Sequence, residues 1–185
     1  MNGNFEECLA HTLREEGGFV NHPQDPGGMT NLGITKRTYE GWIKRPVEEQ
    51  EMRALTPKDV EPIYRYNYWM AVKGDELPTG VDLVVFDLGV NSGPTTAIKF
   101  LQRAVGVPAD GLFGPKTRAA VAAMKPDDII RSVCEARLNF LKGLSTWPVF
   151  GKGWGARVKR VQETALKMSA VRRKPALEGV RPDVA

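Results

Sequence analysis

Cysteine and histidine are scarce in this sequence, which has two of each among 185 residues. Cys8 and Cys134 lie far apart, each within an apolar pattern typical of a helix, so we expect two buried, reduced thiols. A CxxC pair and a cysteine–histidine cluster are both absent, and His11 and His22 have no partner at triad or metal spacing. The nucleotide motifs GxxxxGK[ST] and GxGxxG are missing too. The sequence therefore predicts no metal ion and no cofactor.

Long apolar runs are also missing. No segment approaches the roughly 18 residues that cross a membrane, so we expect no stable membrane insertion. The N-terminal segment MNGNFEECLAHTLREEGG is acidic and amphipathic, without the basic start and apolar centre of a secretory signal. We therefore expect synthesis in the cytoplasm and arrival at any extracellular target by another route.

Positive charge is in slight excess, with a net charge of +4 and a pI of about 9.1. Such an excess favours a polyanionic partner, which would be nucleic acid, lipopolysaccharide or an anionic cell wall. The charge is diffuse except at the end of the chain, where we interpret residues 171–185 as a basic flexible tail. Hydrophobic residues make up 42% of the sequence, enough for a packed core.

Helical patterns dominate the chain. Apolar residues recur at helical spacing over residues 5–13, Asn4 with Glu7 predicts a capping box before them, and Gly17 predicts the end of that helix. Residues 19–35 differ, because two short apolar segments flank a loop rich in proline and glycine. This segment predicts a small β-hairpin or meander.

A second set of signals extends the helical prediction. Thr56, Pro57 and Asp59 predict a capped helix start, and Pro62 should kink the early part of that helix. The apolar segment 81–90, VDLVVFDLGV, suits a buried strand or a central helix, and we favour the helix from its spacing. Further helices are expected at 35–44, 93–106, 114–124, 126–144 with Asp127 as its cap, and 153–170. The predicted fold class is mainly α (α+β).

Glu16 is the first candidate for chemistry. The apolar stripe of the first helix, continued from Leu13 by three residues, reaches Glu16, whereas Glu15 points about 100° away, toward solvent. Burial and the negative end of the helix dipole both favour a protonated carboxyl, which is what a general acid requires. Asp25 follows in a loop stiffened by prolines, where it should be ionised. Two carboxyls in opposed environments are typical of glycoside hydrolysis, although a helix end and a turn would also explain them.

Aromatic side chains gather in the same half of the sequence, and sugar rings stack on such faces. Core packing is the alternative explanation for most of them. They are Tyr39, Trp42, Tyr64, Tyr66, Tyr68 and Trp69.

The segment EEGGFVNHPQDPGGMTNLGIT, residues 15–35, resembles the signature of the glycoside hydrolase family 108 muramidases. The segment IYRYNYW, residues 63–69, is similar to a Tyr-Trp helix of that family. The residues LQ, DGLFG and PKT between 101 and 117 resemble the peptidoglycan-binding-like region that follows in these enzymes. The resemblance implies a lysozyme-like helical fold with a β-hairpin near the active site. It also implies a catalytic lobe at residues 1–88 and a peptidoglycan-binding-like helical lobe at residues 89–170.

The resemblance also implies roles for individual residues. It places the catalytic glutamate at Glu16, and we add Asp25 and Thr30 as catalytic candidates. The spacing from Asp25 to Thr30 is five residues, against six in phage-type lysozymes, which leaves Asn31 as a rival for that position. The expected substrate-binding residues are Asn31, Tyr39, Trp42, Tyr68, Trp69 and Asn91.

These residues predict an N-acetylmuramidase that cleaves the β-1,4 bond between N-acetylmuramic acid and N-acetylglucosamine. One alternative is a lytic transglycosylase acting on the same bond, which needs a single acid. Another is a non-catalytic peptidoglycan-binding or secretion-accessory protein. The expected partner is bacterial peptidoglycan rather than nucleic acid, and the chain is expected to be a monomer. The missing signal fits a phage or prophage endolysin that waits in the host cytoplasm and acts on the cell wall after release.

Overall fold

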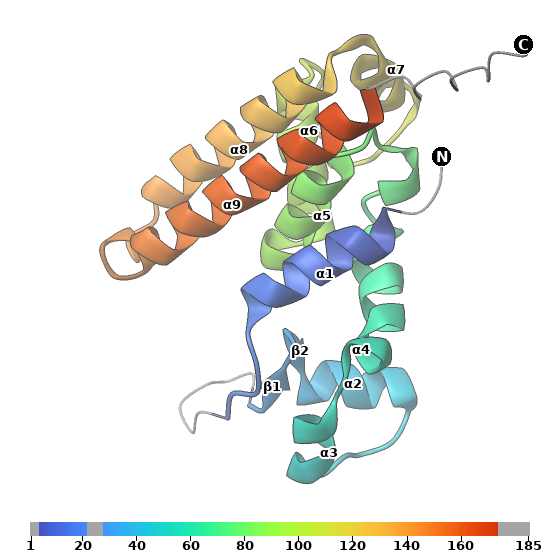
Figure 1. Cartoon of the computed structure of the whole chain (residues 1–185), viewed down its shortest axis with the longest axis vertical. Helices are drawn as coiled ribbons and strands as arrows, with labels where there is room; N and C mark the ends of the chain where they lie inside the picture. Colours follow the sequence, from blue (N-terminus) through green and yellow to red (C-terminus); the bar gives the residue numbers. More distant parts are fainter. Residues whose placement is uncertain (1–3, 22–27, 174–185) are drawn as a thin grey trace, which may run out of the picture.

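The computed structural model describes residues 4–21 and 28–173 of the chain. This part is built from helices and one two-stranded sheet (Figure 1), which confirms the mainly α fold class with a small hairpin. In chain order the elements are α1 (Phe5–Glu16), β1 (Thr30–Asn31), β2 (Ile34–Thr35), α2 (Lys36–Ile43), α3 (Glu49–Ala54), α4 (Pro57–Tyr64), the π-helix η1 (Arg65–Trp69), the 3-10 helix η2 (Gly74–Glu76), α5 (Val81–Ser92), α6 (Pro94–Ala104), α7 (Pro115–Ala123), α8 (Pro126–Lys142) and α9 (Trp147–Arg173).

The helix α1 lies between two groups of elements. The hairpin and the helices α2 to α4 lie on one side of it, and α5 to α9 lie on the other (Figure 1). The helices α8 and α9 run side by side as a long antiparallel pair next to α5. The C-terminal end of α1 therefore faces both groups.

The hairpin is small and tightly turned. Thr30 pairs with Thr35 and Asn31 with Ile34, and both turn residues between them have positive φ, with Leu32 at 49° and Gly33 at 73°. Such a turn matches the right-handed twist of two short antiparallel strands. The backbone of Val20 exchanges two hydrogen bonds of 2.8 Å with Thr30, so the chain leaving α1 adds a short third pairing.

The predicted capped helix at Thr56 is confirmed, because Asp59 accepts hydrogen bonds from the backbone N and the hydroxyl of Thr56. Pro62 lies inside α4 and removes one backbone donor from it. The helix then widens into η1, where the amide of Met70 donates to the carbonyl of Arg65 at 2.9 Å. Figure 1 shows α4 reaching from the hairpin side toward α5.

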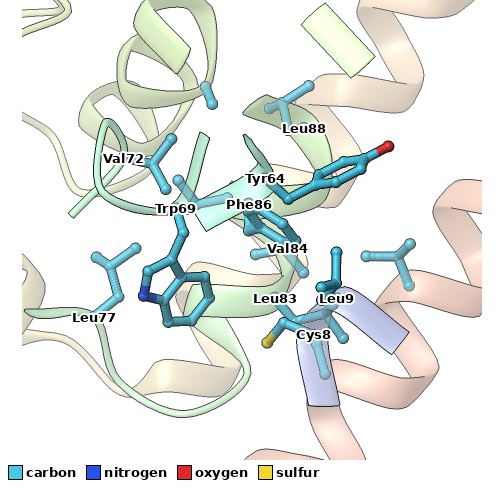
Figure 2. Packing of buried hydrophobic residues seen from close by; sticks show 14 of the residues in the cluster. Cys8, Leu9, Tyr64, Trp69, Val72, Leu77, Leu83, Val84, Phe86 and Leu88 are labelled. Atoms are coloured by element: carbon cyan, nitrogen blue, oxygen red, sulfur yellow. The ribbon is translucent and has the colours of Figure 1, made fainter. Parts of the chain in front are cut away.

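The helix α5 is the centre of the core. Every residue from Val81 to Gly89 is buried, which confirms the helix predicted from the spacing in VDLVVFDLGV. The rings of Trp69 and Phe86 meet edge to face with centroids 5.5 Å apart, and Phe5 of α1 packs on both. Figure 2 shows Trp69 and Phe86 together with Cys8 at this junction. The core therefore joins α1, η1 and α5.

Helix starts were the less accurate part of the sequence prediction. Asn4 precedes α1, but its side chain caps nothing there and instead donates to Asp82 of α5 at 2.7 Å. The helix α8 begins at Pro126 with Lys125 before it, so Asp127 is inside the helix rather than its cap. Similarly, α9 begins at Trp147, not near residue 153. Each difference depends on contacts with distant residues or on a proline that fixes the first turn.

The thiols of Cys8 and Cys134 are buried and free, as the sequence predicts. Burial raises the pKa of Cys134 to about 12 and raises the pKa of Cys8 as well, so neither thiol is a nucleophile. Within the described residues, no helix is both long and apolar enough to cross a membrane.

Candidate active site

Glu16 is the last residue of α1, and its side chain is 19% exposed. It accepts a hydrogen bond of 2.6 Å from Nη2 of Arg157 in α9. The following residues, Gly17 and Gly18, leave open space, since an added Cβ at either would meet no atom of residues 4–21 or 28–173 within 4 Å. The carboxyl is thus fixed on one side and approachable on another.

Arg157 is itself held in place by Asp87 of α5. Nη2 of Arg157 lies 2.8 Å from Oδ1 of Asp87, and Nε lies 3.2 Å from the same oxygen. Arg137 of α8 donates from Nη1 to Oδ2 of Asp87 at 2.6 Å. Three helices thereby place one guanidinium group against Glu16.

Asp87 carries a full charge in the middle of the core. Its side chain is 0% exposed. Burial alone would raise the pKa of Asp87, but the cations of Arg137 and Arg157 hold that pKa below its ordinary value. Asp87 in turn raises the pKa of Arg157 against the effect of burial, so Arg157 remains a cation. The cluster is consequently a set of fixed charges.

The hairpin closes the other side of Glu16. A Cβ at Gly33 would lie 2.3 Å from the hydroxyl oxygen of Tyr64 and 2.9 Å from Cγ of Glu16. The hydroxyl of Tyr64 donates to the carbonyl of Leu32 at 2.9 Å. The ring of Tyr68 lies beside that of Tyr64, with centroids 5.5 Å apart, and burial followed by the charge of Glu16 raises the pKa of Tyr68. Only a residue without a side chain fits between the turn and α1.

Both glutamates have neighbours that were not expected. The surroundings of Glu16 include a guanidinium group that the sequence did not predict, because Nη2 of Arg157 lies 2.6 Å from the carboxyl. Glu15 does not point into solvent. Its side chain is 9% exposed and pairs with Arg160 through two bonds of 2.8 and 2.6 Å, and this hydrogen bonding lowers the pKa of Glu15.

The catalytic candidates beyond Glu16 have different outcomes. Asp25 lies outside the described residues, as does His22. Thr30 is on β1 and pairs through its backbone with Val20 and Thr35. Asn31 is 5% exposed, and its amide donates to the carbonyls of Met52 at 2.8 Å and Arg53 at 3.3 Å. Asn31 therefore ties α3 to the hairpin, which corrects the expectation that it binds substrate.

The aromatic candidates divide into core and surface residues. Trp69 is 1% exposed and Tyr39 is buried on α2, so the expectation that they stack on sugar rings is corrected to core packing. Trp42 is exposed and lies 5.9 Å from the ring of Tyr66. Tyr68 is partly buried near Glu16, and Asn91 is exposed at the end of α5. Tyr68 and Asn91 thus remain candidates close to the charged cluster.

Comparison with known proteins matches two successive regions of the chain. Residues 9–93 match the family model described as glycosyl hydrolase 108, and residues 96–159 match a predicted peptidoglycan domain. The structure of SagA from Brucella abortus is similar, with 50% sequence identity and a TM-score of 0.79, over 90% of this chain and 96% of SagA. The chain belongs to the glycosyl hydrolase 108 family. Among curated proteins, none matches the chain significantly.

Membership of the glycosyl hydrolase 108 family confirms the resemblance seen in residues 15–35. It makes the protein a glycoside hydrolase, and the second matched region supports peptidoglycan as its substrate. Glu16 lies within the glycosyl hydrolase 108 region, whereas Arg157 lies within the predicted peptidoglycan domain. Ion pairs join the two matched regions, among them those of Arg157 with Glu16 and Asp87.

The sequence prediction missed Asp87, Arg137 and Arg157. One signal was available for Asp87, because an acid in the middle of the apolar segment VVFDLGV must be paired or hydrogen bonded if that segment is buried. The arginines carry no local signal, since they are two of many basic residues on long helices. Among the described residues, no group of three His, Cys, Asp or Glu side chains is placed to hold a metal ion.

Proposed function

We propose that the protein is a lysozyme-type N-acetylmuramidase that hydrolyses the β-1,4 bond between N-acetylmuramic acid and N-acetylglucosamine. The observation that carries this proposal is the placement of Glu16. Its carboxyl is partly exposed beside the open backbone of Gly17 and Gly18, and the Arg157–Asp87 pair fixes it from behind. A fixed carboxyl next to open space is what proton donation to a glycosidic oxygen requires.

Arg157 serves to position Glu16 rather than to react. Because Asp87 and Arg137 are buried and paired with each other, the guanidinium group of Arg157 has little freedom beside Asp87, and the carboxyl that it holds is restricted with it.

We keep Asp25 as the second carboxyl of the reaction and Thr30 as the residue that holds the attacking water. The support for Asp25 is its place in the matched glycosyl hydrolase 108 region, nine residues after Glu16. Hydrolysis would proceed by protonation of the leaving oxygen and attack of water at the anomeric carbon, with an oxocarbenium-like transition state between them.

The test uses Glu16→Gln, which keeps the shape of the side chain and removes its acid. We expect the variant to fold, as judged by circular dichroism and thermal melting, and to release reducing ends from peptidoglycan at least about 10²-fold more slowly. Near-native activity of this variant would end the assignment. The control is Glu48→Gln, an exposed glutamate before α3, which should leave the rate unchanged.

Mass spectrometry of the products separates the reaction types. Hydrolysis adds one water to each cleaved bond, whereas a lytic transglycosylase leaves 1,6-anhydro ends and a binding protein releases no fragments. The endolysin role, storage in the host cytoplasm and the monomeric state remain predictions from the sequence. Lysis of bacteria that express the chain together with a membrane-pore protein, but not without it, would support the first two.

A further inference from the structure

A polar pocket of about 350 Å³ lies beside the cluster that holds Glu16. It is formed where the end of α1, the end of α5, and the pair α8 and α9 meet. Arg157 is shared, because it lines the pocket and donates to Glu16. The pocket is lined by Glu15, Asn91, Arg137, Leu141, Gly153, Trp154, Arg157 and Arg160.

The three arginines of the pocket have donors that no protein group uses. Arg137 is 3% exposed, and its Nε is buried without a hydrogen-bond partner among the described residues. Among the described residues, Arg157 and Arg160 each donate through Nε and Nη2, which leaves Nη1 of both without a partner there. A buried donor without an acceptor is costly, so a ligand that supplies oxygen atoms would be stabilised here.

One wall of the pocket is aromatic. The ring of Trp154 lines it, and the exposed ring of Phe150 stacks on Trp154 with centroids 5.5 Å apart and planes 28° apart. Gly153 adds no side chain, and a Cβ there would meet no atom within 4 Å in the part of the chain that the structure describes. The exposed amide of Asn91 stands at the end of α5. The pocket therefore combines guanidinium donors, an amide and a flat apolar face.

We propose that this pocket binds a carboxylate of the peptide arm of peptidoglycan, with an apolar part of the arm against Trp154. The proposal rests on the proposed function, because it takes peptidoglycan as the substrate. The peptide arms carry free carboxylates, and the unused guanidinium N–H groups of the pocket can donate charge-assisted hydrogen bonds to a carboxylate. Residues 137, 141, 153, 154 and 157 of the pocket also lie within the matched peptidoglycan domain.

A binding experiment tests the pocket without any cleavage. The probe is N-acetylmuramyl tetrapeptide, a single sugar with its peptide and no glycosidic bond, titrated into the full chain by calorimetry. We expect the carboxylate form to bind at least about tenfold more tightly than the same compound with every carboxylate amidated. Equal affinity of the two forms, or no binding of either, would overturn the proposal.

Variants then assign the binding to the pocket. Arg160→Gln and Asn91→Ala should each weaken the probe severalfold, whereas Lys159→Gln, an exposed neighbour on α9 that does not line the pocket, should not. If Arg160→Gln does not fold, the affinity of Asn91→Ala for the probe tests the pocket alone. Unchanged affinity in folded variants, or the same loss in Lys159→Gln, would place the ligand elsewhere and sink the idea.

Kinetics separate this proposal from the hydrolase assignment. The wild type and both variants are compared on intact peptidoglycan and on glycan strands stripped of peptides by an amidase. We expect Arg160→Gln to lower kcat/KM about tenfold more on the intact substrate than on the stripped strands. Equal losses on both substrates contradict the peptide-arm site. Absence of cleavage by the wild type would instead refute the proposed function, while the calorimetry still decides the pocket.

Discussion

Glu16 and Asp87 accept hydrogen bonds from the same nitrogen atom, Nη2 of Arg157, at 2.6 and 2.8 Å. One of these carboxyls is partly exposed at the end of α1, and the other is enclosed in the core. The guanidinium group between them is fixed by the buried carboxyl of Asp87 and in turn restricts the side chain of Glu16.

Asp87→Asn should destabilise the protein by about 3–5 kcal/mol, because it leaves the buried guanidinium group of Arg137 without its counter-charge and removes one of the two carboxylates paired with Arg157. Urea unfolding at neutral pH measures the change. Asp75→Asn is the matched control, since Asp75 is exposed on η2, and it should change the free energy of unfolding by less than about 0.5 kcal/mol. A similar small effect for Asp87→Asn would show that the buried network contributes little.

Arg157→Lys should lower kcat more than it changes KM. Lysine keeps the charge but cannot reach Glu16 and Asp87 together with a planar fork, so the acid loses its orientation while the sugar-binding surface remains. We expect at least about a tenfold fall in kcat, measured by release of reducing ends from stripped glycan strands. Arg131→Lys, at an exposed position on α8, is the control. An unchanged kcat in Arg157→Lys would remove Arg157 from the mechanism.

Gly33→Ala should impair both stability and activity. The new methyl group would press on the hydroxyl of Tyr64 and on Cγ of Glu16, and the φ of 73° is unfavourable for alanine. We expect a loss of about 1–3 kcal/mol in thermal or urea unfolding. Gly41→Ala is the opposite case, because an added Cβ there meets nothing and alanine favours the helix, so it should stabilise by about 0.5–1 kcal/mol. Equal effects at both positions would contradict the packing described here.

Acid should weaken the fold through His11. Burial lowers the pKa of His11 in the folded protein. The unfolded chain takes up a proton at this residue near pH 6.5, and the folded chain does so only at lower pH. Stability should therefore fall as the pH decreases from about 7 toward 5, since the unfolded state then binds more protons. Urea midpoints at pH 7.5 and 5.5 test this, and His11→Gln should show a smaller pH dependence than the wild type.

Local signals in the sequence were sufficient for several elements. The helix α5 followed from the spacing of its apolar residues, and the start of α4 followed from Thr56 and Asp59, because both depend on neighbours within one or two turns. The position of Glu16 at the end of α1 was also predicted. These features need no knowledge of the tertiary fold.

Other features could not be read locally. Glu15 was expected in solvent, but Arg160 reaches it from α9, 145 residues further along the chain. Asn31 and Trp69 have side chains suited to sugar binding. Asn31 instead donates a hydrogen bond to a carbonyl of α3, and Trp69 packs in the core. Helical periodicity gives the direction of a side chain on its own helix, and the partner arriving from a distant helix decides its environment.

The position of Arg157 limits how this chain can be cut or recombined. The region that matches the hydrolase family ends at residue 93, but the counter-ion of its glutamate comes from α9. A fragment that stops after α5 would retain Glu16 and lose the cation opposite it. The region up to residue 93 therefore depends on α9. Replacing the residues after 93 with an unrelated module should remove the cation that holds Glu16 and lower the activity.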